Sequence, residues 1–311
     1  MPVLQTLLRI TSFKSPFLST LVPSIALSYG IQAGVAVPSI LAHSERFYDA
    51  SGSVTYLFLA IPHLRARAAA SAAGLAKPAI TLSSFNWRQL ALSLAIGIWA
   101  TRLGTFLFRR INKEGSDSRF DKIRDKALPF AGAFFIQATW VAVCSLPVLA
   151  LNSIPAPILA KLPALLATDA IGLALYAGGI SFEALADYQK SVWMEEKKQK
   201  KHDEPFLSAG LWSKSRHPNY FGESCLWSGI AVAAGGILVR NIGQSAIGLS
   251  GGWPGRIGAA SMAAISPAFV TSLLLFVSGI PLSEKKYDEK YGDRKDYQKW
   301  KKEVPMFIPK L

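Results

Sequence analysis

Cysteine is scarce in this chain, and its few residues exclude two classes of protein. The 311 residues contain only 2 cysteines, Cys144 and Cys225, and both fall inside apolar segments. A disulfide framework needs more cysteines in exposed loops, and a structural zinc site needs about four clustered ligands. We therefore expect two buried thiols and no metal site.

Acidic residues are also few, at 20 Asp and Glu against 34 Lys and Arg, which gives a net charge of +14. A nucleic-acid-binding protein would share this charge, but such proteins rarely carry repeated apolar runs of about 20 residues. Here half of the residues are hydrophobic, and the charges lie between the apolar runs. We predict an integral membrane protein that has the lipid bilayer, and no nucleic acid, as its partner.

The glycine-rich signatures of soluble nucleotide-binding domains are missing as well. No G-x-G-x-x-G motif is present, and the glycine-rich stretch 248–258 lacks the preceding strand and the Lys-Ser/Thr of a P-loop. We interpret that stretch as a turn.

Long apolar runs, by contrast, are abundant. A bilayer core of about 30 Å is crossed by roughly 20 helical residues. The sequence predicts an all-α, polytopic membrane helix bundle with about seven transmembrane helices, the second one short. The candidate spans are 17–40, 52–64, 88–108, 129–151, 163–182, 219–239 and 260–282.

The basic residues predict how the chain is organised around these spans. Of the 34 Lys and Arg, 24 fall in connectors and a tail that seven spans would place on one side of the bilayer. The positive-inside rule makes this side cytoplasmic. We expect an N-terminal segment, which is either a targeting segment or a flank of the first helix, then the bundle, and a basic cytoplasmic tail. The N-terminal segment comprises residues 1–16, the bundle 17–282 and the tail 283–311. The cytoplasmic loops of the bundle are 41–51, 109–128 and 183–218.

The densest polar constellation is SKSRHPNYFGESCLW, residues 213–227. Pro218 suits the first position of a helix, where its missing N–H is not needed. Arg216, Asn219, Tyr220 and Glu223 then share one helix face. A glutamate one turn inside a membrane helix is costly unless it is bound, so we predict a ligand site here. The alternative is an interfacial cap with Arg216 and His217 at headgroup level.

Two further constellations carry suitable chemistry. In residues 182–201, Glu183, Asp187 and Lys190 share a face, where the acids can accept hydrogen bonds from ribose hydroxyls and the lysine can pair with phosphate. An exposed helix with salt bridges is the alternative. Arg102 lies near the end of its span, where it either snorkels to the interface or clamps an anion inside the bundle. The tail has two interpretations also, a layer on anionic lipid or a lid over the site.

At these residues the chain resembles the membrane reductase superfamily related to steroid 5-alpha-reductases. It is most similar to the uncharacterised branch with a steroid 5-alpha-reductase-like C-terminal domain. The matching text runs in order over residues 45–311 and includes FYDASGS (47–53), WATRLGTFLF (99–108), GSDSRF (115–120), FEALADYQK (182–190), SRHPNYFGE (215–223) and GIPLSE (279–284).

The resemblance implies an NADPH-dependent oxidoreductase of seven helices that reduces a double bond of an apolar, lipid or sterol-like enone. It implies a home in the endoplasmic reticulum, with a mitochondrial membrane as the alternative. The resemblance also implies which residues contact the cofactor. These are Arg102, Asp187, Arg216, Asn219, Tyr220 and Glu223, and in addition Glu183, Lys190, His217 and Glu284. The oligomeric state is left open.

The catalytic residues are not assigned by the resemblance. Trp99 stands where the reductases have a tyrosine, and an indole N–H is a weak donor and no acid. The nearest candidates for the partner acid are Glu45 and Asp49.

Two alternatives remain open for the function. Isoprenylcysteine carboxyl methyltransferases and related lipid methyltransferases also carry an Arg-His-Pro-x-Tyr run with a later glutamate, where it resembles an S-adenosylmethionine site. The second alternative is a non-catalytic membrane scaffold that has the same fold without the chemistry.

Overall fold

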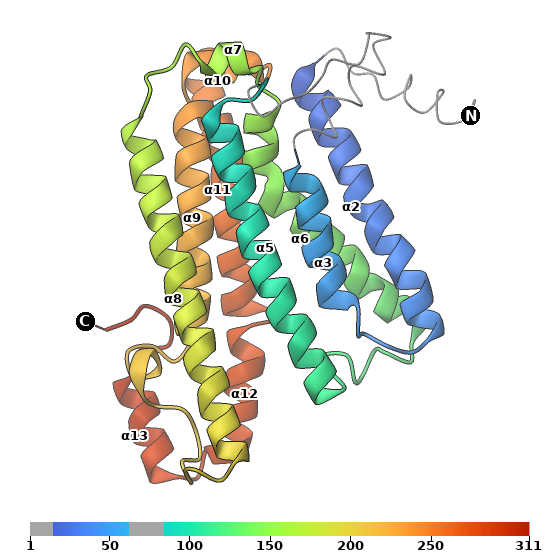
Figure 1. Ribbon diagram of the computed structural model, residues 1–311, viewed down its shortest axis with the longest axis vertical. Helices are drawn as coiled ribbons and strands as arrows, with labels where there is room; N and C mark the ends of the chain where they lie inside the picture. The colour runs from blue at the N-terminus through green and yellow to red at the C-terminus, as the bar shows by residue number, and fades with distance from the viewer. Residues whose placement is uncertain (1–14, 62–83, 311) are drawn as a thin grey trace. The chain divides into compact units, whose positions relative to one another are not determined.

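All regular elements in residues 15–61 and 84–310, which the computed structural model describes, are helices (Figure 1). This confirms the all-α bundle. The predicted segment at 1–14 and the connector at 62–83 lie outside the described residues. The helices are α2 (Pro16–Leu41), α3 (Tyr48–Ala60), α5 (Trp87–Glu114), α6 (Ala127–Asn152), α7 (Ala156–Leu159), α8 (Ala167–Lys198), the 3-10 turn η2 (Gly210–Ser213), α9 (Pro218–Leu238), α10 (Asn241–Ala246), α11 (Trp253–Phe276), α12 (Ile280–Tyr291) and α13 (Lys295–Glu303).

Six stretches of the described chain are long and apolar enough to cross a bilayer, which identifies an integral membrane protein. The predicted short span 52–64 corresponds to α3, but its 13 described residues reach only about 20 Å and do not qualify as a full span. The six stretches are Pro16–Leu41, Trp87–Glu114, Ala127–Asn152, Ala167–Lys198, Pro218–Leu238 and Trp253–Tyr291.

Two helices extend further than the apolar pattern predicts. Helix α5 runs six residues past its predicted end and stops at Gly115, which adopts a left-handed φ of 82°. Helix α8 continues sixteen residues past its predicted end, to Lys198. Charged residues end an apolar run without ending a helix, because they are good helix formers. The connectors predicted at 109–128 and 183–218 are therefore shorter than expected.

The chain divides into two compact units. Unit 1 contains the described residues of Met1–Asp169 together with Val232–Ser266. Unit 2 contains Ala170–Ala231 and Pro267–Leu311, of which 170–231 and 267–310 are described.

In unit 1, α2 packs against α6, and α3 packs against α5 (Figure 1). A buried polar network joins three of these helices. Gln137 Nε2 donates to Gln32 Oε1 (2.8 Å) and to Ser51 Oγ (3.0 Å), and Gln32 Nε2 donates to Thr55 Oγ1 (2.8 Å). Interhelical hydrogen bonds of this kind stabilise membrane helix pairs, where apolar burial provides little drive.

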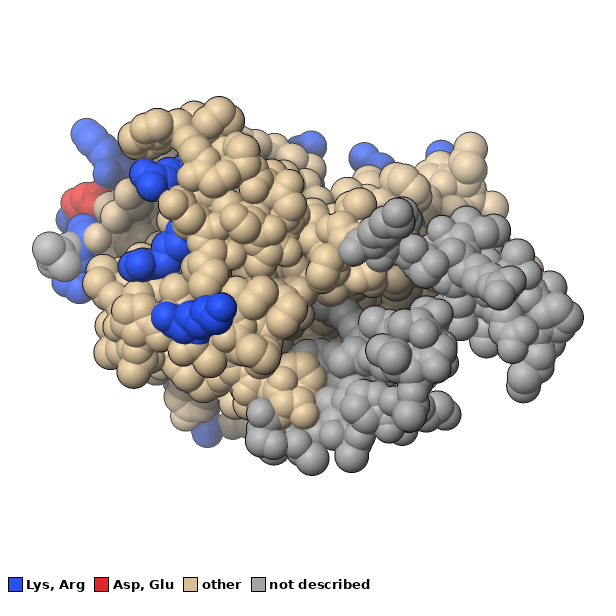
Figure 2. Space-filling view, turned by 90° about the horizontal axis from the view of Figure 1, so that it is seen from above, with Lys and Arg blue, Asp and Glu red and all other residues tan. Residues whose placement is uncertain are grey.

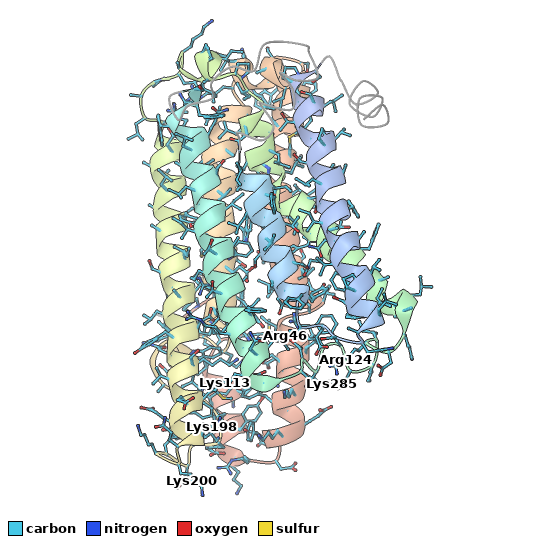
Figure 3. The ribbon with its side chains drawn as sticks, turned by 45° about the vertical axis from the view of Figure 1, so that its right-hand side comes forward. Arg46, Lys113, Arg124, Lys198, Lys200 and Lys285 are labelled. Atoms are coloured by element: carbon cyan, nitrogen blue, oxygen red, sulfur yellow. The ribbon has the colours of Figure 1, made fainter. Side chains whose placement is uncertain are left out.

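One end of unit 1 is basic, and Figure 3 shows Arg46, Lys113 and Arg124 together there. Ion pairs join the loop before α3 and the first turn of α3 to the loop before α6 at this end. Arg124 contacts both carboxylate oxygens of Glu45 at 2.7 Å. Arg119 bridges Asp49 (2.8 Å) and Asp117 (2.7 Å).

The other end of unit 1 carries α7 and α10. Viewed from above in Figure 2, this face is mostly uncharged, with scattered Lys and Arg. One charged pair is fully buried here, because Arg88 and Asp169 are 3% and 2% exposed and lie 2.7 Å apart. Arg88 also donates to the carbonyl of Pro163 (2.7 Å), so the pair fixes the start of α5 against the segment that leads into α8.

In unit 2, glycines allow the backbones of α8 and α9 to approach closely. A Cβ added at Gly179 would lie 2.5 Å from the backbone nitrogen of Leu226, and one at Gly222 would lie 2.6 Å from that of Glu183. Small residues at such crossings are typical of membrane helices. The close approach places the polar end of α8 beside the first turn of α9, which begins at Pro218 as predicted.

Candidate functional site

A cleft in unit 2 is built from α8, the segment before α9, and the two tail helices. Its space is about 310 Å³, part of which is open to solvent. Because this figure includes open solvent, the enclosed space is much smaller, and the cleft suits part of a cofactor rather than all of one. Its lining is cationic and aromatic, and consists of Lys190, Leu207, Trp212, Arg216, His217, Ser283, Glu284, Tyr287, Tyr297 and Trp300.

The C-terminal tail forms one side of this cleft. The backbone nitrogen of Arg216 donates to the carbonyl of Pro305 (2.9 Å), and Ser215 Oγ donates to the carbonyl of Phe307 (2.8 Å). Phe307 also packs edge-to-face on Phe221 of α9, with ring centroids 5.8 Å apart. Of the two interpretations of the tail, these contacts support the one in which it folds over the Arg-His-Pro segment.

The aromatic walls of the cleft are held by hydrogen bonds. Trp212 Nε1 donates to the carbonyl of Ala186 on α8 (3.1 Å), and Trp300 Nε1 donates to the carbonyl of Trp212 (3.3 Å). The ammonium of Lys190 lies over the Trp212 ring, 5.0 Å from its centre. Ring orientation is thereby fixed before any ligand binds.

Basic groups converge on one carboxylate at the cleft. His217 Nε2 lies 2.9 Å from Glu284 Oε1, while Arg216 and Lys301 approach Oε2 at 3.4 and 3.3 Å. Burial lowers the pKa of His217 below its ordinary value although Glu284 opposes this, so the ring is neutral at physiological pH and donates to the carboxylate. The same ring stacks on Tyr220, with centroids 5.6 Å apart.

Two of the predicted residues, Asp187 and Asn219, lie outside the cleft lining, where α8 meets α9. Asn219 Nδ2 donates to Asp187 Oδ1 across 3.3 Å, and Asp187 is 7% exposed. Oδ1 of Asn219 and Nε of Arg216 are buried and have no hydrogen-bond partner among the described residues. Buried polar atoms without a partner are costly, so these two are candidates for contact with a ligand.

Glu183 of α8 and Glu223 of α9 are both buried, at 2% and 9% exposure. Buried carboxyl groups in membrane helices are functional candidates by default.

Nine of the ten predicted cofactor residues belong to unit 2. Four of them line the cleft, namely Lys190, Arg216, His217 and Glu284.

The tenth predicted residue, Arg102, belongs to unit 1 on α5. Its role as a cofactor contact stays a prediction. Trp99, one turn earlier on α5, is 1% exposed and meets Tyr56 edge-to-face at 5.0 Å, so it has a packing role in the core. The candidate acids Glu45 and Asp49 are engaged in the ion pairs with Arg124 and Arg119.

The sequence patterns missed part of the cleft. Trp212, Tyr287, Tyr297 and Trp300 line the cleft but belong to none of the predicted constellations, and the same holds for Lys301 beside Glu284. The position of Trp212 four residues before Arg216 is the one local signal that could have included it. Long-range folding of the tail brings the other residues to the cleft.

The arrangement is suited to an anionic ligand with flat rings. Cationic side chains pair with phosphate, a neutral histidine and an amide give directional hydrogen bonds, and indole rings offer stacking surfaces. The donor set thus fits the phosphate, ribose and base of a nucleotide cofactor.

Comparison with known proteins gives one family. The sequence matches the family described as "Protein of unknown function (DUF1295)" over residues 66–246 and 252–304. No curated protein and no solved structure matches the chain.

Proposed function

We propose that this chain, which belongs to the DUF1295 family, is a membrane-embedded NADPH-dependent reductase. The family is linked to steroid 5-alpha-reductase-like membrane proteins. The observation that carries this proposal is the cleft of unit 2. There Lys190 and Arg216 lie with Trp212 and Trp300 around one opening.

The charge of the cleft favours NADPH over S-adenosylmethionine. NADPH is a polyanion, whereas the methyl donor carries a sulfonium cation next to its amino acid group. Lys190 and Arg216 in the lining, with Lys301 beside Glu284, outnumber the carboxylates of Glu284 and of Asp288, which pairs with Lys301. A cationic site attracts phosphate and repels a sulfonium.

Roles for this chain's residues follow from the geometry. Arg216 and Lys190 would bind phosphate oxygens, and the free Oδ1 of Asn219 would accept a hydrogen bond from a ribose hydroxyl or a carboxamide. Asp187 orients Asn219 by accepting from its Nδ2. The indoles of Trp212 and Trp300 exclude water and offer a face to a base.

The substrate we propose is an apolar lipid or sterol-like molecule with an enone, because α8 and α9 are membrane helices. Bound NADPH would supply a hydride to one carbon of an activated double bond and leave as NADP⁺, and a proton from solvent would complete the other carbon. The resemblance to reductases motivates the enone, and it motivates the endoplasmic reticulum as the membrane. Microscopy of the tagged full chain, scored against mitochondrial and reticular markers, tests the location.

A binding experiment tests the proposal. The full chain, purified in detergent, is titrated with NADPH and separately with S-adenosylmethionine while thermal unfolding is followed. A ligand at about 100 times its dissociation constant stabilises the folded state by about 2.7 kcal/mol, which gives a clear shift. We expect NADPH to raise the unfolding temperature and to quench tryptophan fluorescence through Trp212 and Trp300.

Other outcomes would redirect the assignment. A shift with the methyl donor alone overturns the reductase in favour of a methyltransferase. A shift with neither ligand favours a scaffold. If NADPH binds, loss of its absorbance with enone lipids in the same detergent then tests turnover.

A further inference from the structure

The carboxylate of Glu284 occupies a position that suits a ligand phosphate. Its Oε1 lies 2.9 Å from His217 Nε2, and its Oε2 lies within 3.4 Å of both Arg216 and Lys301. Three donors from two segments, the residues before α9 and helix α13, thus surround one anionic group. Oxygens of a phosphate bind to the same kinds of donor.

The donors do not depend on Glu284 for their placement. Arg216 also donates from one terminal nitrogen to the carbonyl of Lys301 (3.1 Å), and its Nε is buried without a partner in the described chain. Its side chain is 10% exposed. Lys301 is held by Asp288, at 2.7 Å from Oδ2. The cations would therefore stay in place if Glu284 moved away.

Glu284 itself is more exposed than Arg216 and His217. It lies in the second turn of α12, lines the cleft and is 18% exposed. A glutamate side chain has several rotatable bonds, so it can swing toward solvent when a stronger anion competes for the same donors.

We propose that Arg216, His217 and Lys301 form a phosphate subsite in which the Glu284 carboxylate stands in for a phosphate group of the ligand. The ligand class is a phosphorylated nucleotide, and the phosphate is either the 2′-phosphate or the pyrophosphate. This inference rests on the proposed nucleotide site and names Lys301 as an additional specificity-determining residue.

The subsite predicts effects of opposite sign for two substitutions. Glu284→Gln removes the competing charge but keeps a hydrogen-bond acceptor for His217, so it strengthens phosphate binding by about fivefold. Lys301→Gln removes one donor cation and weakens binding by a similar factor. If Glu284 instead accepted a hydrogen bond from the ribose of the ligand, Glu284→Gln would weaken ligand binding.

Exposed neighbours on the same helices provide charge-matched controls. Glu289 on α12 is 67% exposed and Lys299 on α13 is 75% exposed. Glu289→Gln and Lys299→Gln change the net charge by the same amounts, so they report any general effect of charge on affinity.

The experiment measures dissociation constants of NADPH, NADH and inorganic pyrophosphate for the detergent-purified full chain and the four variants. We expect tighter binding in Glu284→Gln, weaker binding in Lys301→Gln and no change in the controls. An effect on NADPH without one on NADH or pyrophosphate assigns the 2′-phosphate, and equal effects on all three assign the pyrophosphate.

Weaker or unchanged binding in Glu284→Gln overturns the subsite, provided that the variant unfolds at the wild-type temperature. Pyrophosphate separates this inference from the proposed function. If NADPH fails to bind but pyrophosphate binds with the predicted opposite effects, the subsite stands and the NADPH assignment fails.

Discussion

The amide of Asn219 donates a hydrogen bond to the carboxylate of Asp187 across 3.3 Å, and this contact joins the first turn of α9 to α8. The two residues are 32 positions apart in the chain. The contact uses only the donor side of the amide, and the acceptor Oδ1 is left buried and without a partner among the described residues.

This geometry leads to a prediction about binding. Asn219→Ala removes the acceptor, and we expect the dissociation constant for NADPH to rise at least about tenfold, because a lost hydrogen bond in a buried site is worth about 1.4 kcal/mol. Isothermal titration of the detergent-purified protein measures it. Gln199→Ala, an exposed carboxamide just beyond α8, is the control and should bind as the wild type does. An unchanged constant in Asn219→Ala would remove that residue from the site.

The crossing of α8 and α9 gives a second prediction, in which two adjacent glycines differ. Gly179→Ala would place a Cβ 2.5 Å from the Leu226 nitrogen, while a Cβ at Gly178 meets nothing within 4 Å. We expect Gly179→Ala to lower the free energy of unfolding by about 1–3 kcal/mol because the backbones must separate. Gly178→Ala should be neutral or slightly stabilising. Thermal unfolding of both variants measures the difference in stability. Equal stabilities would contradict the close approach of the two helix backbones.

The buried pair in unit 1 gives a third prediction. Removal of one partner leaves an uncompensated buried charge, so Arg88→Ala should destabilise the protein by about 3–5 kcal/mol. Arg256→Ala, which removes an exposed arginine beside Trp253, is the control and should cost far less. Thermal unfolding in detergent measures both variants. Similar losses in the two variants would show that the buried pair is not a specific contact.

The loop before α6 gives a prediction for pH. Burial opposes ionisation of Asp117, but the hydrogen bond and charge of Arg119 outweigh it, together with Arg110, and hold the pKa of that carboxyl below its ordinary value of 3.8. A group with a depressed folded pKa contributes stability that is present above its unfolded pKa and is lost as the pH falls through its folded pKa. We therefore expect Asp117→Asn to unfold at a lower temperature than wild type at neutral pH.

The difference between these two proteins should stay constant as the pH falls to about 4 and then shrink below that value. Unfolding temperatures measured across the range test the sign. A difference that grows on acidification would show that the folded-state pKa of Asp117 is raised rather than lowered.

Apolar runs predicted most of the helices, because helix length in a bilayer depends on local sequence. Each predicted span overlaps a helix, and the proline start of α9 was read from Pro218 alone. The helix ends were predicted less well, since α5 and α8 continue into charged residues. The charged residues that follow the apolar runs of α5 and α8 are compatible with either a loop or a helix.

The site divides in the same way. Asp187, Lys190, Arg216 and Asn219 stand in short motifs whose spacing places them on helix faces, so the sequence was sufficient to select them. Trp300 and Lys301 lie more than eighty residues beyond Arg216, and no local pattern connects them with it.

By itself, the sequence determined that this is an α-helical membrane protein and which polar residues are concentrated at helix ends. Only the tertiary structure decided that the tail returns to Arg216 and His217, that glycines bring α8 against α9, and that Glu284 lies among three basic groups. The physical reason is that hydropathy and helix periodicity act over a few turns. The return of the tail depends on side-chain packing and hydrogen bonds between residues far apart in the chain.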